Sequence, residues 1–255
     1  MRHPRAWSDG RRHLTMVAQQ HCLLIGNSRW HWAERTPVSS SAAAGAHVWR
    51  FSHGMPTQTR LDDLPSLTGW AAVGPVPSHP LLQSTSQLGL AEIPLGEKPP
   101  WLGVDRALAG WGAWVRAGQS SSVMVVDAGT VLSLTRVSRT GCFAGGWLAA
   151  GVRLQLRAMA EGTVALQVPG HANADLFAGT DFPLETAQAM RRGVVESLVG
   201  LILQAQDKDA SSLWLCGGDA PILKSALASR GMAVTHAPDL VMQSMVSLVS
   251  SVPDR

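Results

Sequence analysis

The residues best suited to chemistry lie in two short turns, each of which separates a pair of apolar strands. Gly26 follows the apolar run Cys22–Ile25, and Gly129 follows Val123–Val126 after two intervening residues. A glycine turn leaves backbone N–H groups free to approach an anion, because no Cβ stands in the way. The pattern therefore favours two phosphate-binding hairpins, although a single turn of this kind is more often a plain hairpin.

Three charged side chains and one hydroxyl accompany these turns. Asp127 ends an apolar strand, where a carboxylate needs a cation or hydrogen-bond donors. Thr130 can donate from both its hydroxyl and its N–H. Asp105 precedes a helix that contains Ala and Trp, where a carboxylate either orients a reacting hydroxyl or caps the helix. Its neighbour Arg106 offers a planar guanidinium, which can hold an anion or form a surface ion pair.

The flanking sequence predicts two α/β halves, each opening with one of these hairpins. The equivalent glycines, Gly26 and Gly129, lie 103 positions apart, which indicates a duplicated unit. The first half is expected to contain, in chain order, strands at 22–25 and around 30–32, a loop at 36–44, a short helix and a strand within 61–76, and Pro-rich linkers at 75–80 and 94–100. The second half is expected to contain, in chain order, strands at 122–126, 131–137 and 142–144, helices at 147–161 and 184–205, a strand at 212–216, a helix ending at 229, a strand at 233–236 and a helix at 238–250.

This layout predicts two domains, at residues 21–118 and 119–255. Residues 1–20 stand apart, because four arginines crowd the first twelve positions and the apolar core of a secretory signal is missing. Such a segment is typical of a disordered tail, or of a chain whose translation starts at Met16.

The composition excludes several classes of protein. Of the 255 residues, 45% are hydrophobic and 15% are charged, which argues against a disordered chain. The formal net charge is +3 and the basic residues are scattered, so no basic stripe favours nucleic acid as a partner. No apolar run reaches the roughly 18 residues that span a bilayer. The three cysteines fit neither a zinc pattern nor a disulfide framework, which favours a reducing compartment, the cytoplasm.

Four blocks of sequence resemble the type III pantothenate kinases, which belong to the superfamily of acetate and sugar kinases, actin and heat-shock ATPases. The order and spacing of the blocks carry the resemblance, which runs from about Leu23 to about Leu248. The blocks are, in chain order, Ile25–Arg29, Leu102–Arg106, Val125–Thr130 with Gly145, Gly146 and Gly151 downstream, and Leu215–Asp219. Thr186 also fits a family helix that contributes a substrate-binding threonine.

The resemblance implies an enzyme that transfers the γ-phosphate of ATP to the hydroxyl of pantothenate, the first step toward coenzyme A. It also implies two RNase H-like (actin-like ATPase) domains with the active site in the cleft between them. Family members are homodimers, use a divalent metal such as Mg²⁺, and need a monovalent cation such as K⁺ or NH₄⁺. The helix of Thr186 would lie at the subunit interface and bring Thr186 to the substrate site.

The resemblance also implies a role for each matching residue. Asp105 would be the catalytic base, and Asp127 would hold the monovalent cation. The residues implied for pantothenate binding are Gly103, Val104, Asp105, Arg106 and Thr186. The residues implied for ATP binding are Ile25, Gly26, Asn27, Ser28, Arg29, Gly129, Thr130, Gly217 and Gly218.

The sequence departs from the family pattern at three positions. Leu24 replaces the usual Asp of the first motif, Thr135 replaces an acid after the second phosphate motif, and Ala150 replaces a proline. Leu24 favours an alternative, a non-catalytic or accessory protein of the same fold with impaired ATP and metal binding. The intact block Gly103–Arg106 favours an active pantothenate kinase over that alternative. It also argues against a third class, a different phosphotransferase or nucleotide hydrolase on the same scaffold.

Overall fold

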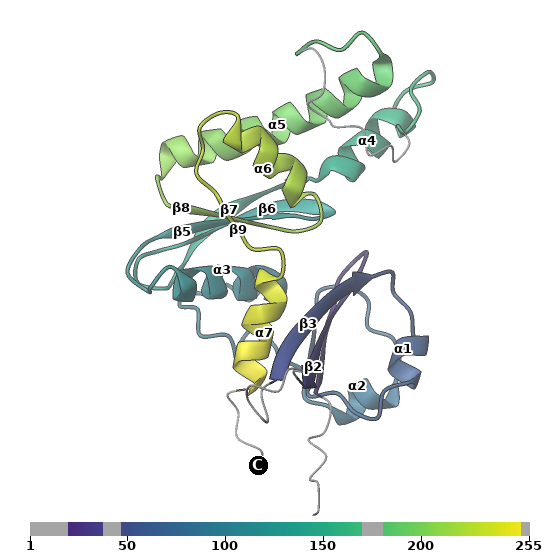
Figure 1. The fold of residues 1–255 in the computed structure, drawn as a ribbon, viewed down its shortest axis with the longest axis vertical. Helices are drawn as coiled ribbons and strands as arrows, with labels where there is room; N and C mark the ends of the chain where they lie inside the picture. The colour runs from purple at the N-terminus through teal and green to yellow at the C-terminus, as the bar shows by residue number, and fades with distance from the viewer. Residues whose placement is uncertain (1–19, 38–46, 170–180, 251–255) are drawn as a thin grey trace, which may run out of the picture.

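The computed structural model of the chain describes residues 20–37, 47–169 and 181–250 and consists of two lobes, each built on its own β-sheet (Figure 1). The predicted tail lies outside the described residues apart from residue 20. The mixed content of helices and strands confirms the predicted α/β class. None of the described helices is long and apolar enough to cross a membrane.

The first lobe contains a four-stranded sheet in the order β3-β2-β1-β4. The first two strands form the predicted antiparallel hairpin, and the fourth runs parallel to the first. Two short helices, α1 (Thr59–Asp62) and α2 (Pro80–Ser84), lie on the outer side of this lobe (Figure 1). The strands are β1 (His21–Ile25), β2 (Trp30–Pro37), β3 (His47–Gly54) and β4 (Gly69–Ala72).

The second lobe repeats this pattern and adds one strand, giving the order β7-β6-β5-β8-β9. Again the first two strands form an antiparallel hairpin, and the strand on the other side of the first is parallel to it. The predicted duplication is therefore present in the pairing of the strands. The strands are β5 (Val123–Ala128), β6 (Val131–Val137), β7 (Phe143–Ala150), β8 (Ser212–Cys216) and β9 (Thr235–His236).

Two helices, α3 (Val104–Arg116) and α7 (Leu240–Ser250), form a layer between the sheets (Figure 1). Alternate residues of a strand face opposite sides of a sheet. Accordingly, Cys22 and Leu24 of β1 pack in the same apolar cluster as α3 and α7, whereas Leu23 packs on the opposite face beside α1 and α2.

The outer face of the second sheet is covered by the remaining helices. Val126 and Leu134 pack there with apolar side chains of α4, α5 and α6, whereas Val125 packs on the inner side with α3 and α7. These outer helices are α4 (Val152–Glu161), α5 (Thr186–Lys208) and α6 (Ala220–Ala228). The two lobes therefore share one internal layer and each has an outer layer of its own.

One predicted helix boundary is wrong. The segment expected to begin a helix at Trp147 is part of β7, in which Trp147 pairs with Leu134, and the helix begins only at Val152. The pair Gly145-Gly146 does not end the strand. At Gly146 the neighbouring strand comes so close that a Cβ would lie 2.0 Å from the carbonyl oxygen of Leu134, so the glycine permits this pairing.

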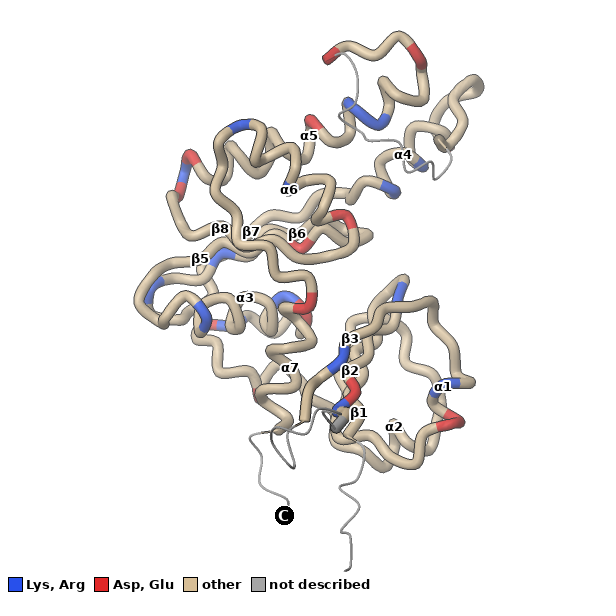
Figure 2. The backbone as a smooth tube through the Cα atoms, in the orientation of Figure 1, with Lys and Arg blue, Asp and Glu red and all other residues tan. Residues whose placement is uncertain are grey.

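Basic and acidic residues are interspersed along both lobes, as Figure 2 shows for the described backbone. The charged side chains that take part in the chemistry below therefore act as individual groups, which the fold brings to the site.

Candidate active site

The two predicted phosphate-binding turns meet between the lobes. The hydroxyl oxygens of Ser28 and Thr130 lie 2.8 Å apart, although 102 positions separate these residues in the sequence. The first turn is closed by the N–H of Gly26, which donates to the carbonyl oxygen of Arg29 at 3.0 Å. Two glycine turns with polar side chains thus face each other, as expected for residues that hold one anion from two sides.

A third glycine turn closes the site beside β5. Gly217 has a φ of +91°, and a Cβ there would lie 2.5 Å from Oδ1 of Asp127, so only glycine fits. The next residue, Gly218, faces the first turn, since its Cβ would lie 3.8 Å from Nη1 of Arg29. The N–H of Asp219 donates to the carbonyl oxygen of Ala128 at 2.9 Å, which fixes this turn to the end of β5.

Asp127 is a carboxylate in a low-dielectric position. Burial, together with the smaller effect of the charge of Asp105, raises its pKa to about 7. No hydrogen-bond donor to its side chain is present among the described residues. Asp105 and Asp127 are neighbouring carboxylates, and Asp127 has no hydrogen-bond donor among the described residues. This arrangement favours a bound cation. The described residues contain no cluster of three or more His, Cys, Asp or Glu side chains that could hold a metal by themselves.

Asp105 lies in the first turn of α3, whereas the sequence predicted that it precedes the helix. The N-cap of α3 is Gly103, so Asp105 does not cap the helix. Its Oδ1 accepts a hydrogen bond of 2.7 Å from the N–H of Arg106. Burial raises the pKa of Asp105, and the bond from Arg106 and its charge oppose that rise. A carboxyl group with a raised pKa is suited to accept a proton.

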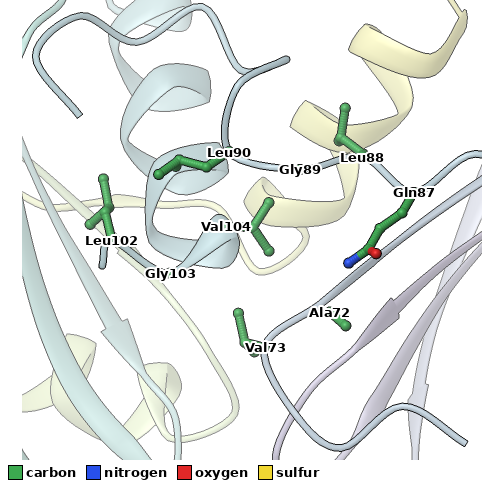
Figure 3. A pocket seen from close by; sticks show the side chains of 9 residues that line it. All are labelled: Ala72, Val73, Gln87, Leu88, Gly89, Leu90, Leu102, Gly103 and Val104. Carbon is green, nitrogen blue, oxygen red and sulfur yellow. The ribbon is translucent and has the colours of Figure 1, made fainter. Parts of the chain in front are cut away.

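A cavity of about 330 Å³ opens beside this carboxylate. It is lined by Ala72 at the end of β4 and Val73 after it, by residues 87–90 and by Leu102–Val104, and Figure 3 shows the lining residues around it. The lining is apolar apart from backbone groups and the amide of Gln87. A Cβ on Gly103 would lie 2.5 Å from Oδ1 of Asp105 and 3.7 Å from Cγ1 of Val73, so the cavity wall and the carboxylate are neighbours.

The structure explains the first departure from the family pattern. Leu24 is only 4% exposed and packs in the apolar cluster between the sheets, together with Val104 and Ala71. This position is therefore part of the core.

Thr186 is the one predicted substrate-binding residue that the fold of a single chain keeps apart from the others. It is the exposed first residue of α5. That helix covers the outer face of the second sheet, whereas α3 with Asp105 lies on the inner face (Figure 1).

Arg153 lies at this site although the motifs do not indicate it. Burial raises the pKa of Asp219, and the charges of Arg153 and Arg29 oppose that rise. Arg153 is the second residue of α4, and the helix starts against the second turn, because the N–H of Gly151 donates to the carbonyl oxygen of Thr130 at 3.0 Å. The sequence signal that could have identified Arg153 is its position two residues after Gly151, a glycine that matches the family pattern.

Comparison with known proteins agrees with this geometry. The family model described as "Type III pantothenate kinase" matches residues 78–208, just over half of the chain. A type III pantothenate kinase of Thermosynechococcus vestitus is 36% identical over 216 residues, which cover 82% of this chain and 81% of the relative. One from Synechococcus elongatus is 32% identical over 231 residues, covering 86% and 89%.

Solved structures show the same fold at low sequence identity. A Campylobacter jejuni protein described as a Baf family transcriptional activator has a TM-score of 0.55 at 18% identity, covering 90% of this chain and 96% of that one. A Sinorhizobium meliloti protein described as a 2-dehydro-3-deoxygalactonokinase has a TM-score of 0.54 at 14% identity, covering 91% and 98%.

Proposed function

The chain belongs to the type III pantothenate kinase family, and we propose that it transfers the γ-phosphate of ATP to the hydroxyl of pantothenate. The observation that carries this proposal is the position of Asp105, whose carboxylate lies beside a cavity and close to the charge of Asp127. Apart from Leu24, no described residue favours the non-catalytic alternative.

Asp105 acts as the general base of the reaction. Its carboxylate accepts the proton of the pantothenate hydroxyl while the hydroxyl oxygen forms a bond to the γ-phosphorus. The bond from that phosphorus to the bridging oxygen breaks, and ADP leaves. The cavity next to Gly103 and Val104 takes the middle of pantothenate, because its walls combine aliphatic side chains with backbone groups and the amide of Gln87.

The three glycine turns hold the nucleotide. Backbone N–H groups and the hydroxyls of Ser28 and Thr130 donate to phosphate oxygens, while the guanidinium of Arg29 adds positive charge. When ATP binds, phosphate oxygens replace the 2.8 Å contact between the hydroxyls of Ser28 and Thr130. The remaining ATP-binding residues, Ile25, Asn27 and the pair Gly217-Gly218, form the backbone of the same turns.

Asp127 and Asp219 are suited to hold cations. The partly buried Asp127 fits a monovalent cation, K⁺ or NH₄⁺, because a cation offsets the desolvation that raises its pKa. Mg²⁺ commonly binds through one or two carboxylates plus phosphate oxygens, which agrees with the absence of a three-residue cluster among the described residues. When bound, these ions neutralise charge on the triphosphate.

A second subunit completes the proposed substrate site. We place Thr186 at an interface between two copies of the chain, since in one copy it lies across the second sheet from Asp105. The exposed Phe182 and Leu184, at 87% and 99%, precede it and offer apolar area for such a contact. The unpaired cysteines at 22, 142 and 216 suit the reducing cytoplasm.

The test is an assay of the purified protein with labelled pantothenate, ATP, Mg²⁺ and K⁺. We expect phosphopantothenate and ADP in a one-to-one ratio, and no turnover when K⁺ is replaced by a larger organic cation. Hydrolysis of ATP without transfer to pantothenate would point to another phosphotransferase or hydrolase. Absence of any turnover would favour the accessory alternative.

A further inference from the structure

We propose that Thr135 and Phe143 are positioning residues, which hold the guanidinium of Arg106 with its charge unpaired so that it binds the carboxylate end of the substrate. The proposal rests on the proposed function and deepens it, because it assigns the part of the site that recognises an anionic acceptor. It concerns a buried hydroxyl and an aromatic ring to which the sequence motifs assign no role.

The side chain of Arg106 is fixed at three points. Its Nε donates a hydrogen bond of 3.2 Å to Oγ1 of Thr135, and its central carbon lies 5.9 Å from the ring centre of Phe143. Its Nη2 passes close to β7, since a Cβ on Gly146 would lie 3.2 Å from that nitrogen. A hydrogen bond at Nε and a ring against one face fix the plane of the guanidinium. Its two Nη groups can then donate to a ligand that lies in this plane.

Thr135 is built into the contact between α3 and the second sheet. It is 1% exposed, and its methyl carbon would lie 3.4 Å from a Cβ on Gly110. Gly110 follows Arg106 by one helical turn, so both residues lie on the face of α3 that covers β6. The absence of a side chain at Gly110 lets the helix approach closely enough for Arg106 to reach the hydroxyl.

A hydroxyl accepts a hydrogen bond without cancelling the charge of the donor. Among the described residues, no carboxylate oxygen lies within 4.0 Å of the side-chain nitrogens of Arg106. Burial lowers its pKa, and only the nearby charge of Asp105 opposes that effect. A half-buried guanidinium without an ion pair is costly in the free protein, so an incoming carboxylate gains a partner that has already lost part of its water.

The position of Thr135 along β6 determines which end of the substrate Arg106 contacts. Thr135 lies four residues beyond Val131, the first residue of β6 after the phosphate turn, which is about 13 Å along the strand. The reacting hydroxyl and the carboxylate are the two ends of pantothenate. Because Asp105 takes the hydroxyl at the phosphate side, Arg106 anchored at Thr135 faces the other end.

Phe143 is itself held by a further aromatic ring. Trp101 meets it edge to face, with ring centres 6.1 Å apart and an angle of 83° between the planes. Trp101 is 70% exposed, although large aromatic side chains are usually buried. The three side chains Trp101, Phe143 and Arg106 therefore form one series of contacts, which runs from the surface to the site.

The experiment compares pantothenate with its neutral primary amide in wild type and in Thr135→Val, which keeps the shape and removes the hydroxyl. We expect the KM for pantothenate to rise about 10-fold or more, since a hydrogen bond to a charged group is lost. The KM for the amide should change less than about two-fold, because the amide makes no charged contact with Arg106. The kcat for both acceptors should stay within the same two-fold range.

Two further variants separate positioning from folding. Thr135→Ser restores the hydroxyl and should return the preference for pantothenate, and Phe143→Leu should weaken that preference without touching the hydrogen bond. An equal loss for pantothenate and its amide in Thr135→Val, or a loss confined to kcat, would overturn the proposal. If the wild type phosphorylates neither acceptor, the proposed function fails instead, so the two failures are distinguishable.

Discussion

The two hairpins have the same strand pairing but opposite chemistry at the corresponding position. Leu24 in β1 pairs with His31 and Ala71, and Asp127 in β5 pairs with Ser133 and Cys216. Both side chains are directed to the inner layer between the sheets. In the first lobe that position is filled with hydrocarbon, and in the second it carries a partly buried carboxylate whose pKa is raised to about 7.

The comparison teaches that a duplicated scaffold need not duplicate its charges. The first hairpin retains the backbone turn and the hydroxyl of Ser28, which suffice for contact with a phosphate. The second hairpin retains, in addition, the acid near Asp105. We infer that the cation chemistry is confined to the second lobe, while the first lobe contributes neutral donors and the charge of Arg29.

The largest expected effect lies in neither hairpin but in α3. Asp105→Asn should lower kcat by about 10²–10⁴-fold, because an amide cannot accept the proton of the hydroxyl. The KM for ATP should change little, since the hairpins still hold the nucleotide. Steady-state kinetics at saturating ATP measures this, and circular dichroism confirms an unchanged fold. Normal turnover by the variant would remove Asp105 from the base role.

Giving the first hairpin the acid of the second should damage the fold. Leu24→Asp places a carboxylate without a partner in an apolar cluster and should destabilise the protein by about 3–5 kcal/mol. Urea unfolding measures the change, and Leu24→Met serves as the matched apolar control. Tighter ATP binding by a stable Leu24→Asp variant would show that the first hairpin has room for a cation after all.

Removing the acid of the second hairpin should change activity and stability in opposite directions. Asp127→Asn should lower kcat/KM for ATP by about 10–100-fold, the value of one interaction with a charged group. Its melting temperature without ligands should rise, because the amide removes a buried group that ionises at a cost. A variant that loses stability along with activity would indicate that Asp127 supports the fold.

The smallest expected effects are two pH slopes of opposite sign. The pKa of Asp127 is raised from 3.8 to about 7 in the folded chain, so its contribution to stability is full below pH 4 and is lost as pH rises to about 7. The pKa of His31 is lowered from 6.5 to about 4 by burial and then by His53 and Arg29. Its contribution is full above pH 6.5 and is lost as pH falls to about 4.

Melting curves between pH 4 and 8 separate these slopes by variant. Asp127→Asn should remove the loss on the alkaline side, and His31→Gln should remove the loss on the acid side. The neighbours of His31 belong to the same network, since its Nδ1 lies 2.7 Å from Nδ1 of His53, whose Nε2 lies 3.0 Å from Asp239. Parallel curves for wild type and both variants would contradict the assigned pKa directions.

Short-range sequence patterns predicted the two hairpins but missed features that depend on how the strands pair. The apolar runs Cys22–Ile25 and Val123–Val126, which precede Gly26 and Gly129, both lie in strands. The end of β7 was misread, because Gly145-Gly146 resembles a break unless the neighbouring Leu134 is known. The strand His47–Gly54 lies at the sheet edge, and it was not among the expected elements.

The site was predicted residue by residue but not as an arrangement. Motifs identified Asp105 and Asp127, yet only the docking of α3 beneath the second sheet brings their charges together. The contact of Arg106 with Thr135 spans 29 positions and depends on Gly110, which no local pattern marks. The roles of these residues, and the domain boundary near residue 118, stay predictions.

The final helix has a consequence for how the chain folds during synthesis. A Cβ on Gly69 would lie 3.1 Å from a methyl of Val249, and His53 meets Asp239 across 186 positions, so α7 closes the inner face of the first sheet. A ribosome adds about 5–20 residues per second, which leaves Cys22 and Leu24 uncovered for about ten seconds or longer. The first lobe to emerge is therefore the last to be completed, and its exposed sheet is the part of the nascent chain most in need of a chaperone.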